Sequence, residues 1–324
     1  MKILITGAAG LIGGNLARIL TESGHEVVGL DIRVPAPSSV LSDVVDNVNF
    51  VVGDVGDTAL VNRIVMGERV THIMHAAAIA ADQADAQPLQ AIRVNINGTF
   101  NVLEAGRLFG LERVVVLSSS SVNGNHAGRP LDQPLTEADM DMPYGGMYPV
   151  HKLANEGQVQ VFRRQYALSA VAIRPSRVWG PGYARFDLPI PVAMLVRDAM
   201  EGKDIDWPSG ADIRMDITYV RDLCEGLVQA LSVDSIPSPV YTLSSGRLVS
   251  VMEIVEVIRS VFPSIRISIG PGLDYDRGEV PYIIALKSYN DISLARSELG
   301  YDPTYGIEKG IPAYVAWLES RIYI

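Results

Sequence analysis

Short apolar runs alternate with longer segments of helical periodicity through the first half of the chain. Helices are predicted over Leu11–Ser23, Pro88–Gly110 and Tyr148–Tyr166. The apolar runs predict strands at Lys2–Thr6, Val27–Asp31, Asn49–Val52, Thr71–His75, Arg113–Leu117 and Ala170–Arg174. Strands that are apolar throughout and joined through helices are typical of parallel sheets covered on both faces. The pattern therefore predicts an α/β fold with a doubly wound parallel sheet.

The pattern changes after Arg174, where proline and glycine become dense. A helix over Val220–Leu231 and a strand over Val240–Leu243 return to the first pattern, and we expect that strand to be the seventh of the main sheet. Ser250 and Glu253 have the spacing of a capping box at the start of a further helix. We therefore expect a smaller, discontinuous C-terminal domain. The expected division is 1–175 plus about 216–245 for the first domain, and about 176–215 plus 246–324 for the second.

Composition and charge argue against several classes of protein. The chain has 324 residues, 48% hydrophobic and 20% charged, which is ordinary for a globular protein of about two domains. A net charge of −10 argues against a nucleic-acid partner. No apolar stretch reaches the ~18 residues of a membrane helix, and the apolar start is too short for a signal peptide. Cys224 is the only cysteine, so we expect a cytoplasmic protein without disulfides that does not bind membranes.

A glycine-rich turn joins the first predicted strand to the first helix. Gly7 permits a tight turn, Gly10 lets the backbone approach a pyrophosphate, and Gly13 allows the helix to pack on the strand. The helix start at Leu11 and Ile12 offers N–H groups and the positive end of the helix dipole to phosphates. This context predicts a Rossmann-type domain that binds a dinucleotide. The alternative is a glycine-rich turn without a ligand.

Asp31, at the end of the second strand, bears on the choice of dinucleotide. A carboxylate there accepts both ribose hydroxyls of adenosine and repels a 2′-phosphate, which favours NAD over NADP. Arg33 weighs the other way, because NADP sites use a nearby arginine. The alternative role for Asp31 is that of a turn residue at a strand end.

Two further strand ends fit the same ligand. Asp54 and Val55 follow the third strand, and Ala76 and Ala77 follow the fourth. Ligands of open α/β sheets bind at the carboxyl ends of parallel strands, and the small alanine side chains leave room for a cofactor. His75, just before them, is interpreted as a packed core histidine.

Candidate catalytic residues follow the fifth strand and open a later helix. A run of serines occupies 118–121, and Tyr148 and Lys152 share one helix face at i and i+4. Hydride leaves an alcohol carbon only if the hydroxyl proton is also taken, and a free tyrosine with a pKa of about 10 is a poor base. We expect the lysine to lower that pKa, and a serine to hold the substrate oxygen. The set predicts oxidation or reduction of a secondary alcohol.

The same tyrosine–lysine spacing recurs at Tyr305 and Lys309 near the C-terminus. No cofactor strand precedes this copy. We interpret it as part of a surface helix without a catalytic role.

These residues together resemble the extended short-chain dehydrogenase/reductase family, in its NAD-dependent epimerase/dehydratase branch. The resemblance covers nearly the whole chain. Its pieces are TGAAGLIG at 6–13, Asp31, GDV at 53–55, HAA at 75–77, NINGT at 95–99, SSSSVNG at 118–124, YPVHK at 148–152 and RPSRVWGPG at 174–182.

The resemblance implies a role for each candidate catalytic residue. Ser119 is then the catalytic hydroxyl because it lies three residues before Val122, and Ser120 is the second choice, toward the substrate. Tyr148 is the acid/base. Lys152 is its partner and also holds the nicotinamide ribose.

The resemblance also implies cofactor contacts and a subunit partner. Pro175 and Val178 would border the nicotinamide, and Asn95 would support the cofactor side of the site from its helix. Members commonly dimerise through the helices that correspond to Pro88–Gly110 and Tyr148–Tyr166, which implies a homodimer.

Several positions depart from the nucleotide-sugar members of the family. Asparagine is usual where this chain has Arg177, arginine where it has Met215 and Asp276, and tyrosine where it has Asn123. Fewer positively charged side chains are then available to bind a diphosphate. Arg177 and Arg185 are candidates for the carboxylate or phosphate of a smaller substrate, with salt bridges as the alternative.

The sequence thus predicts an NAD-dependent oxidoreductase or epimerase that acts on a secondary hydroxyl of a sugar or sugar acid. A nucleotide-sugar 4-epimerase or dehydratase with recycled NAD is the alternative. A non-catalytic NAD-binding regulator is a third hypothesis, against which the presence of Tyr148 and Lys152 speaks. No metal is expected, because His72 and His75 would face opposite sides of a strand.

Overall fold

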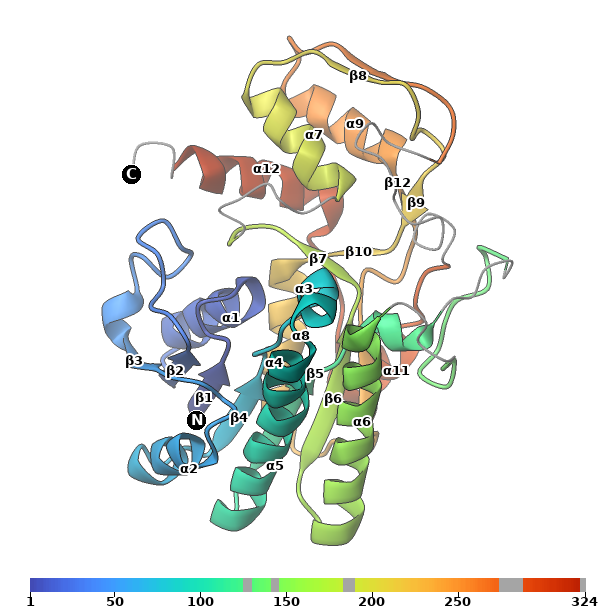
Figure 1. Ribbon diagram of the computed structural model, residues 1–324. Coiled ribbons are helices and arrows are strands. Elements are labelled where there is room, and N and C mark those ends of the chain that lie inside the picture. The colour runs from blue at the N-terminus through green and yellow to red at the C-terminus, as the bar shows by residue number, and fades with distance from the viewer. Residues whose placement is uncertain (125–129, 141–145, 183–189, 274–287, 321–324) are drawn as a thin grey trace.

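The computed structural model describes residues 1–124, 130–140, 146–182, 190–273 and 288–320. A seven-stranded parallel sheet lies at its centre, in the order β11-β6-β5-β4-β1-β2-β3 (Figure 1). The predicted strands are confirmed to within one residue at each end, and Val240–Leu243 is the seventh strand, at one edge. The strands are β1 Lys2–Thr6, β2 Glu26–Asp31, β3 Val48–Val52, β4 His72–His75, β5 Arg113–Leu117, β6 Ala170–Pro175 and β11 Val240–Leu243.

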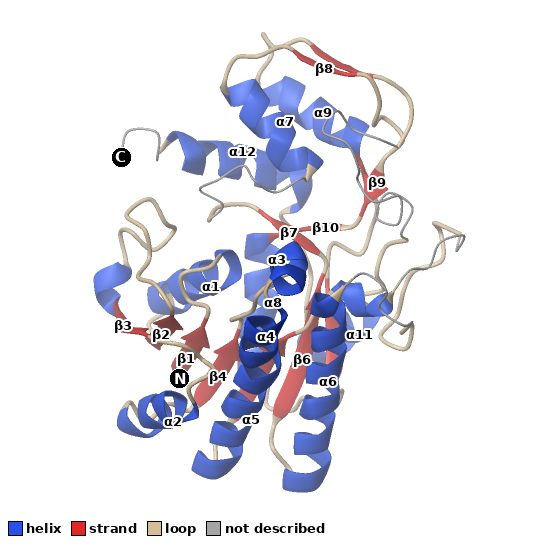
Figure 2. Ribbon diagram, in the orientation of Figure 1, coloured by secondary structure: helices blue, strands red, loops and turns tan. Residues whose placement is uncertain are grey.

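Helices cover both faces of this sheet (Figure 2), and alternate strand residues pack against one layer or the other. Ile3 and Ile5 share a core with side chains of the first layer, whereas Leu4 shares one with the second. This explains why the strands are apolar throughout. The first layer is α1 Leu11–Glu22, α8 Val220–Ser232 and α11 Ser293–Leu299, and the second is α2 Thr58–Gly67, α5 Gly98–Phe109 and α6 Met147–Tyr166.

The predicted helix over Pro88–Gly110 is not regular throughout. It begins as α4 Pro88–Ala91, continues as a π-helical segment Ile92–Asn97, and ends as α5. A π-helical turn widens the helix by one residue and is common near functional sites. Here it contains Asn95, which is buried. A short helix that the sequence did not predict, α3 Ala81–Ala86, precedes it.

The second half of the chain adds a smaller layer above the carboxyl edge of the sheet (Figure 1). Its core includes Trp207, Met215 and Ile254, and the capping box of Ser250 and Glu253 is present. The helices are α7 Pro191–Met200, α9 Val251–Val261 and α12 Gly306–Glu319. The paired short strands are β7 Arg177–Trp179 with β10 Ile217–Tyr219, β8 Ile205–Trp207 with β13 Ile267–Ile269, and β9 Arg214–Met215 with β12 Val249–Ser250.

None of the helices in the described part of the chain combines the length and the apolar character that crossing a bilayer requires.

Candidate active site

The glycine turn after β1 has no room for side chains. Gly7 has φ +71°, and a Cβ added to it would lie 2.7 Å from Ala77 N. A Cβ at Gly13 would lie 2.2 Å from Gly7 O. Gly10 is the N-cap of α1 and no side chain caps that helix within the described residues. The turn is therefore a tight backbone cradle at a helix N-terminus, which fits a pyrophosphate.

Asp31 lies against this turn. Its Oδ2 accepts a hydrogen bond from Ala9 N at 3.0 Å, and its Oδ1 accepts one from Arg33 N at 3.3 Å. Both oxygens keep further lone pairs, and the carboxylate is only half-buried. The arrangement fits the two ribose hydroxyls of NAD.

The loops after β3 and β4 are fixed from the helix layer beneath them. Asp54 accepts from Gly56 N at 2.7 Å and lies 3.3 Å from Arg93 Nη2. Val55 is buried. Asn95 both donates to Ile79 O and accepts from Ile79 N, each at 2.8 Å. Asn95 therefore holds the loop that carries Ala76 and Ala77.

His75 is a core histidine, as the sequence analysis expected. Its ring lies between Thr6 Oγ1 at 2.7 Å and Thr99 Oγ1 at 3.1 Å. Burial, with a smaller contribution from the charge of Lys152, lowers the pKa of His75 to about 3. It is therefore neutral at physiological pH.

Ser119, Tyr148 and Lys152 come together at the carboxyl end of β5. Ser119 lies close enough to the Tyr148 hydroxyl to influence the pKa of that phenol, and Lys152 Nζ lies 5.4 Å from the centre of the tyrosine ring. Lys152 is only 3% exposed and donates to Leu117 O at 2.6 Å. The second candidate serine, Ser120, lies in the 3-10 turn that follows. The three groups thus have the mutual geometry that the sequence predicted.

The pKa values of this pair differ from the expectation. Burial raises the pKa of Tyr148 to about 12, although its bond to Ser119 acts to lower it. Burial lowers the pKa of Lys152 to about 8, against the opposing effect of Glu156. The expected lowering of the tyrosine pKa by the lysine is therefore wrong for the protein alone, because desolvation of the phenolate outweighs an ammonium 5.4 Å from the ring centre.

Glu156, one helical turn beyond Lys152 on α6, forms a buried ion pair with Arg174 that was not predicted from the sequence. Arg174 Nε and Nη2 donate to the two oxygens of Glu156 at 2.8 and 2.7 Å, and Ser118 Oγ donates to Glu156 Oε1 at 2.5 Å. Both ionic side chains are almost inaccessible. The spacing of Glu156, one helical turn beyond Lys152, was the available signal.

The predicted substrate residues are less well defined. Arg177 lies half-buried in β7 and takes part in interactions within the protein, while Arg185 lies outside the described residues. Pro175, at the end of β6, and Val178, in β7, are both buried. Met215 is 2% exposed in the second core and its neighbour Arg214 is exposed, as strand alternation requires.

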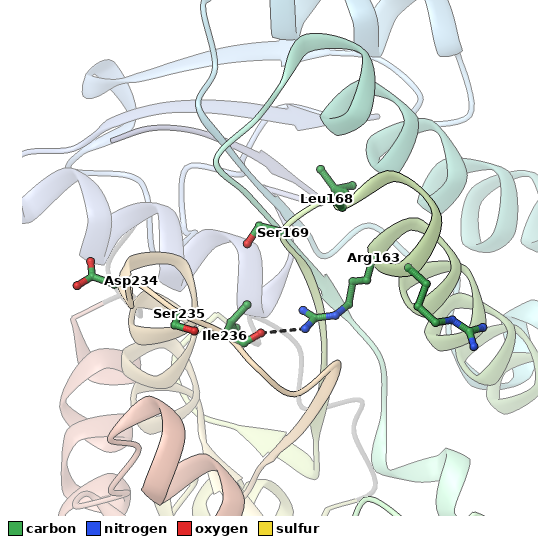
Figure 3. A pocket seen from close by; sticks show the side chains of 8 residues that line it. Arg163, Leu168, Ser169, Asp234, Ser235 and Ile236 are labelled. Carbon is green, nitrogen blue, oxygen red and sulfur yellow. Dashed lines mark hydrogen bonds between the residues drawn. The ribbon is translucent and has the colours of Figure 1, made fainter.

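A pocket at the opposite, amino-terminal edge of the sheet is shown in Figure 3. Arg163, from the last turn of α6, donates there to Ala170 O at 2.6 Å, Ile236 O at 3.0 Å and Pro237 O at 2.8 Å. This guanidinium ties the end of α6 to the segment before β11, so we interpret the pocket as structural.

The sheet, the glycine cradle and the Ser–Tyr–Lys group define an NAD-dependent enzyme of the short-chain dehydrogenase/reductase type. A model of the NAD dependent epimerase/dehydratase family matches residues 3–243, and the chain belongs to that family.

Relatives and solved structures agree over almost the full length. The chain is 28% identical to UDP-glucuronate 4-epimerase 6 of Arabidopsis thaliana, with 98% of this chain and 71% of that protein covered. A structure of UDP-glucuronic acid 4-epimerase from Bacillus cereus in complex with NAD matches with a TM-score of 0.79 and 25% identity, over 100% and 98% of the two chains. UDP-glucose 4-epimerase of Thermotoga maritima has the same fold, with a TM-score of 0.82, 22% identity and 99% of both chains covered.

Proposed function

We propose that the protein oxidises or epimerises a secondary hydroxyl of a sugar or sugar-acid substrate, with Tyr148 as the acid/base. The convergence of Ser119, Tyr148 and Lys152 at one strand end carries the proposal. An isolated surface tyrosine would lack both the second hydroxyl that holds the substrate oxygen and the neighbouring ammonium group. The intact group also argues against a non-catalytic regulator.

The cofactor fits the residues that surround the cradle. We infer that the N–H groups of Leu11, Ile12 and Gly13 meet the pyrophosphate and that Asp31 meets the adenosine ribose, because helix α1 has no side-chain cap. When bound, NAD accepts or returns a hydride at the nicotinamide. Asp54 and Val55 would line the adenine side, and Ala76, Ala77, Pro175 and Val178 the nicotinamide side.

The chain supplies the proton chemistry. Tyr148 Oη is the atom that exchanges a proton with the substrate hydroxyl, and Ser119 Oγ gives that hydroxyl a second hydrogen bond. With a pKa of about 12, the phenol is protonated at neutral pH and ready to donate. Lys152 is mostly charged at pH 7, because its pKa is about 8.

Two substrate classes remain in the proposal. The relatives named above support a nucleotide-activated sugar acid that is inverted at C4 while NAD is recycled. The burial of Met215, where nucleotide-sugar members carry an arginine, supports a smaller acid met by Arg177. Ser120, Arg177 and Arg185 are the substrate contacts that we propose.

One experiment separates these classes. The purified enzyme is incubated with NAD and either UDP-glucuronate or free glucuronate, and products are separated by chromatography while absorbance at 340 nm is followed. A 4-epimer without net absorbance change supports the epimerase, and a steady rise with the free acid supports the dehydrogenase. If neither substrate class turns over, or if Tyr148→Phe turns over as fast as the wild type, the proposal is wrong.

We also propose a homodimer formed through α4, α5 and α6. Helices α5 and α6 pack side by side on one face of the sheet (Figure 1). A monomer seldom leaves so many large apolar side chains in water on adjacent helices, and a two-fold axis would bury the same patch of both copies. The exposed members are Leu89, Ile92, Phe100, Leu108, Phe109, Val150, Val161 and Tyr166.

Sedimentation of charged variants tests the dimer. Phe100→Asp is expected to shift the protein toward the monomer, because it would bury an unpaired carboxylate in the interface. Met66→Asp is the control and should leave the dimer intact, because Met66 is also apolar and exposed but lies on α2, outside the proposed interface. A wild type that sediments as a monomer at micromolar concentration would contradict the proposal.

The two hydrophobic cores support the proposed assignment of cofactor binding to one domain and substrate binding to the other. We infer that 1–175 with about 216–245 binds NAD and that about 176–215 with 246–324 binds substrate, because the second core draws its residues from the latter segments together with the β10 strand. A cytoplasmic location belongs to the same proposal and rests on the single cysteine.

A further inference from the structure

Helix α6, which carries Tyr148 and Lys152, receives its N-terminal cap from another helix. The residue at its own N-cap is Gly146, which has no side chain to offer. Asp85 of α3, 62 residues upstream, accepts a hydrogen bond from Met147 N at 2.7 Å. Met147 is the first residue of α6 and Tyr148 the second. The carboxylate thus satisfies an N–H that the helix cannot satisfy itself, and its charge is favourable at the positive end of the dipole.

The backbone around this contact is shaped to admit Asp85. Gly146 has φ +107°, a conformation that L side chains rarely adopt. A Cβ added there would lie 2.5 Å from Asp85 Oδ2. A glycine at this position is therefore needed both for the turn and for the approach of the carboxylate.

Helix α3 also begins in the loop expected to lie beneath the cofactor. That loop is held at Ile79 by Asn95, and its Ala77 contacts the glycine turn at Gly7. One short segment therefore runs from the cofactor cradle to the first turn of the helix that presents Tyr148.

We propose that Asp85 is a positioning residue that fixes the first turn of α6 and so holds the Tyr148 hydroxyl against Ser119. The inference rests on the proposed function of Tyr148. If the start of the helix frays, its second residue moves more than its sixth. Loss of the cap would therefore displace Tyr148 more than Lys152. Displacement of an acid/base by about 1 Å lowers kcat strongly, whereas groups that only bind the ligand stay in place.

The test compares three variants in the full-length protein. Asp85→Ala is expected to lower kcat about tenfold with little change in the KM for NAD or substrate, because an N-cap is lost. Asp85→Asn keeps an acceptor and is expected to retain activity to within about twofold. Asp57→Ala is the matched control, since Asp57 caps a different helix, α2, by accepting from Leu60 N at 3.0 Å.

Hydrogen–deuterium exchange gives a readout that does not depend on activity. The amide of Met147, which donates to Asp85, is expected to exchange about tenfold faster in Asp85→Ala and at an unchanged rate in Asp57→Ala. Gly146→Ala should have a similar effect, and its combination with Asp85→Ala should be less than additive. Normal exchange and normal kcat in Asp85→Ala would overturn the inference. Full activity of Tyr148→Phe would instead overturn the proposed function, while the exchange result would still decide whether Asp85 caps the helix.

Discussion

Two tyrosine–lysine pairs with the same spacing have different surroundings in this molecule. Tyr148 and Lys152 lie in the first turns of α6, beside the end of β5. The lysine is 3% exposed and the tyrosine lies beside Ser119. Both have pKa values displaced by burial.

The second pair is exposed or engaged in packing. Lys309 is exposed on α12, as predicted. Tyr305 is the N-cap of that helix and is partly buried. Its ring stacks on Tyr219 at 5.4 Å, with the Arg221 guanidinium 4.9 Å away. Spacing places two side chains on one helix face, but only a neighbouring strand end supplies the hydroxyl and the low dielectric that turn them into an acid/base pair.

The largest difference between the pairs is expected in turnover. Tyr148→Phe removes the proton donor and should lower kcat by about 10²–10⁴-fold, the usual contribution of a general acid or base. Tyr305→Phe keeps the stacked ring and should leave kcat unchanged. Steady-state kinetics on the substrate found by the screen measures both. A comparable loss in the two variants would mean that α6 is not the site of proton transfer.

The lysines should differ in their effect on stability. Because the pKa of Lys152 falls from 10.5 unfolded to about 8 folded, its charged form opposes folding at neutral pH. Lys152→Met is therefore expected to abolish activity yet raise the free energy of unfolding by about 1–3 kcal/mol at pH 7. The gain should shrink above pH 8 and vanish above pH 10.5, where both states have lost the proton.

Denaturant unfolding at several pH values measures this effect, with Lys309→Met as the exposed control. The control should change stability by no more than about 0.5 kcal/mol. A Lys152 variant that is less stable than the wild type at pH 7 would show that the bond to Leu117 O outweighs the desolvation.

The sequence predicted the elements that carry long, regular patterns and the residues that follow them. The strands, α6 and the convergence of Ser119 with Tyr148 were all read correctly from periodicity and from the rule that ligands gather at carboxyl strand ends. The two-residue strands such as β9 escaped because so short a run has no period.

Long-range electrostatics were beyond the same reasoning. The direction of the Tyr148 shift depends on how completely the fold removes water, and the Glu156–Arg174 pair joins residues 18 positions apart that only the packing of α6 on β6 brings together. Asp85 is a similar case, since no local pattern predicts a cap supplied from 62 residues away.

A buried, neutral histidine, His75, lies within electrostatic reach of Lys152. The pKa of His75 falls from 6.5 to about 3 on folding, chiefly by burial and in part through Lys152. Below pH 6.5 the unfolded chain takes up a proton that the folded chain does not. The free energy of unfolding therefore decreases as the pH decreases. The wild type should lose free energy of unfolding between pH 7 and pH 5.5, and His75→Gln should make that loss smaller by about 1 kcal/mol. Equal slopes in wild type and His75→Gln would place the acid sensitivity elsewhere.

The smallest expected effect belongs to the second pair. Tyr305→Leu removes the stack on Tyr219 and the contact with Arg221, and should cost about 1 kcal/mol of stability with kcat unchanged. Tyr305→Phe keeps both aromatic contacts and should cost less than half as much. Thermal unfolding monitored alongside kinetics distinguishes the cases. A loss of turnover in Tyr305→Leu without a loss of stability would mean that α12 communicates with the active site, and the contrast between a catalytic and a packing pair would have to be abandoned. The backbone N–H of Tyr305 is bound to Asp222 at 3.0 Å, so the start of α12 should stay in place in either variant.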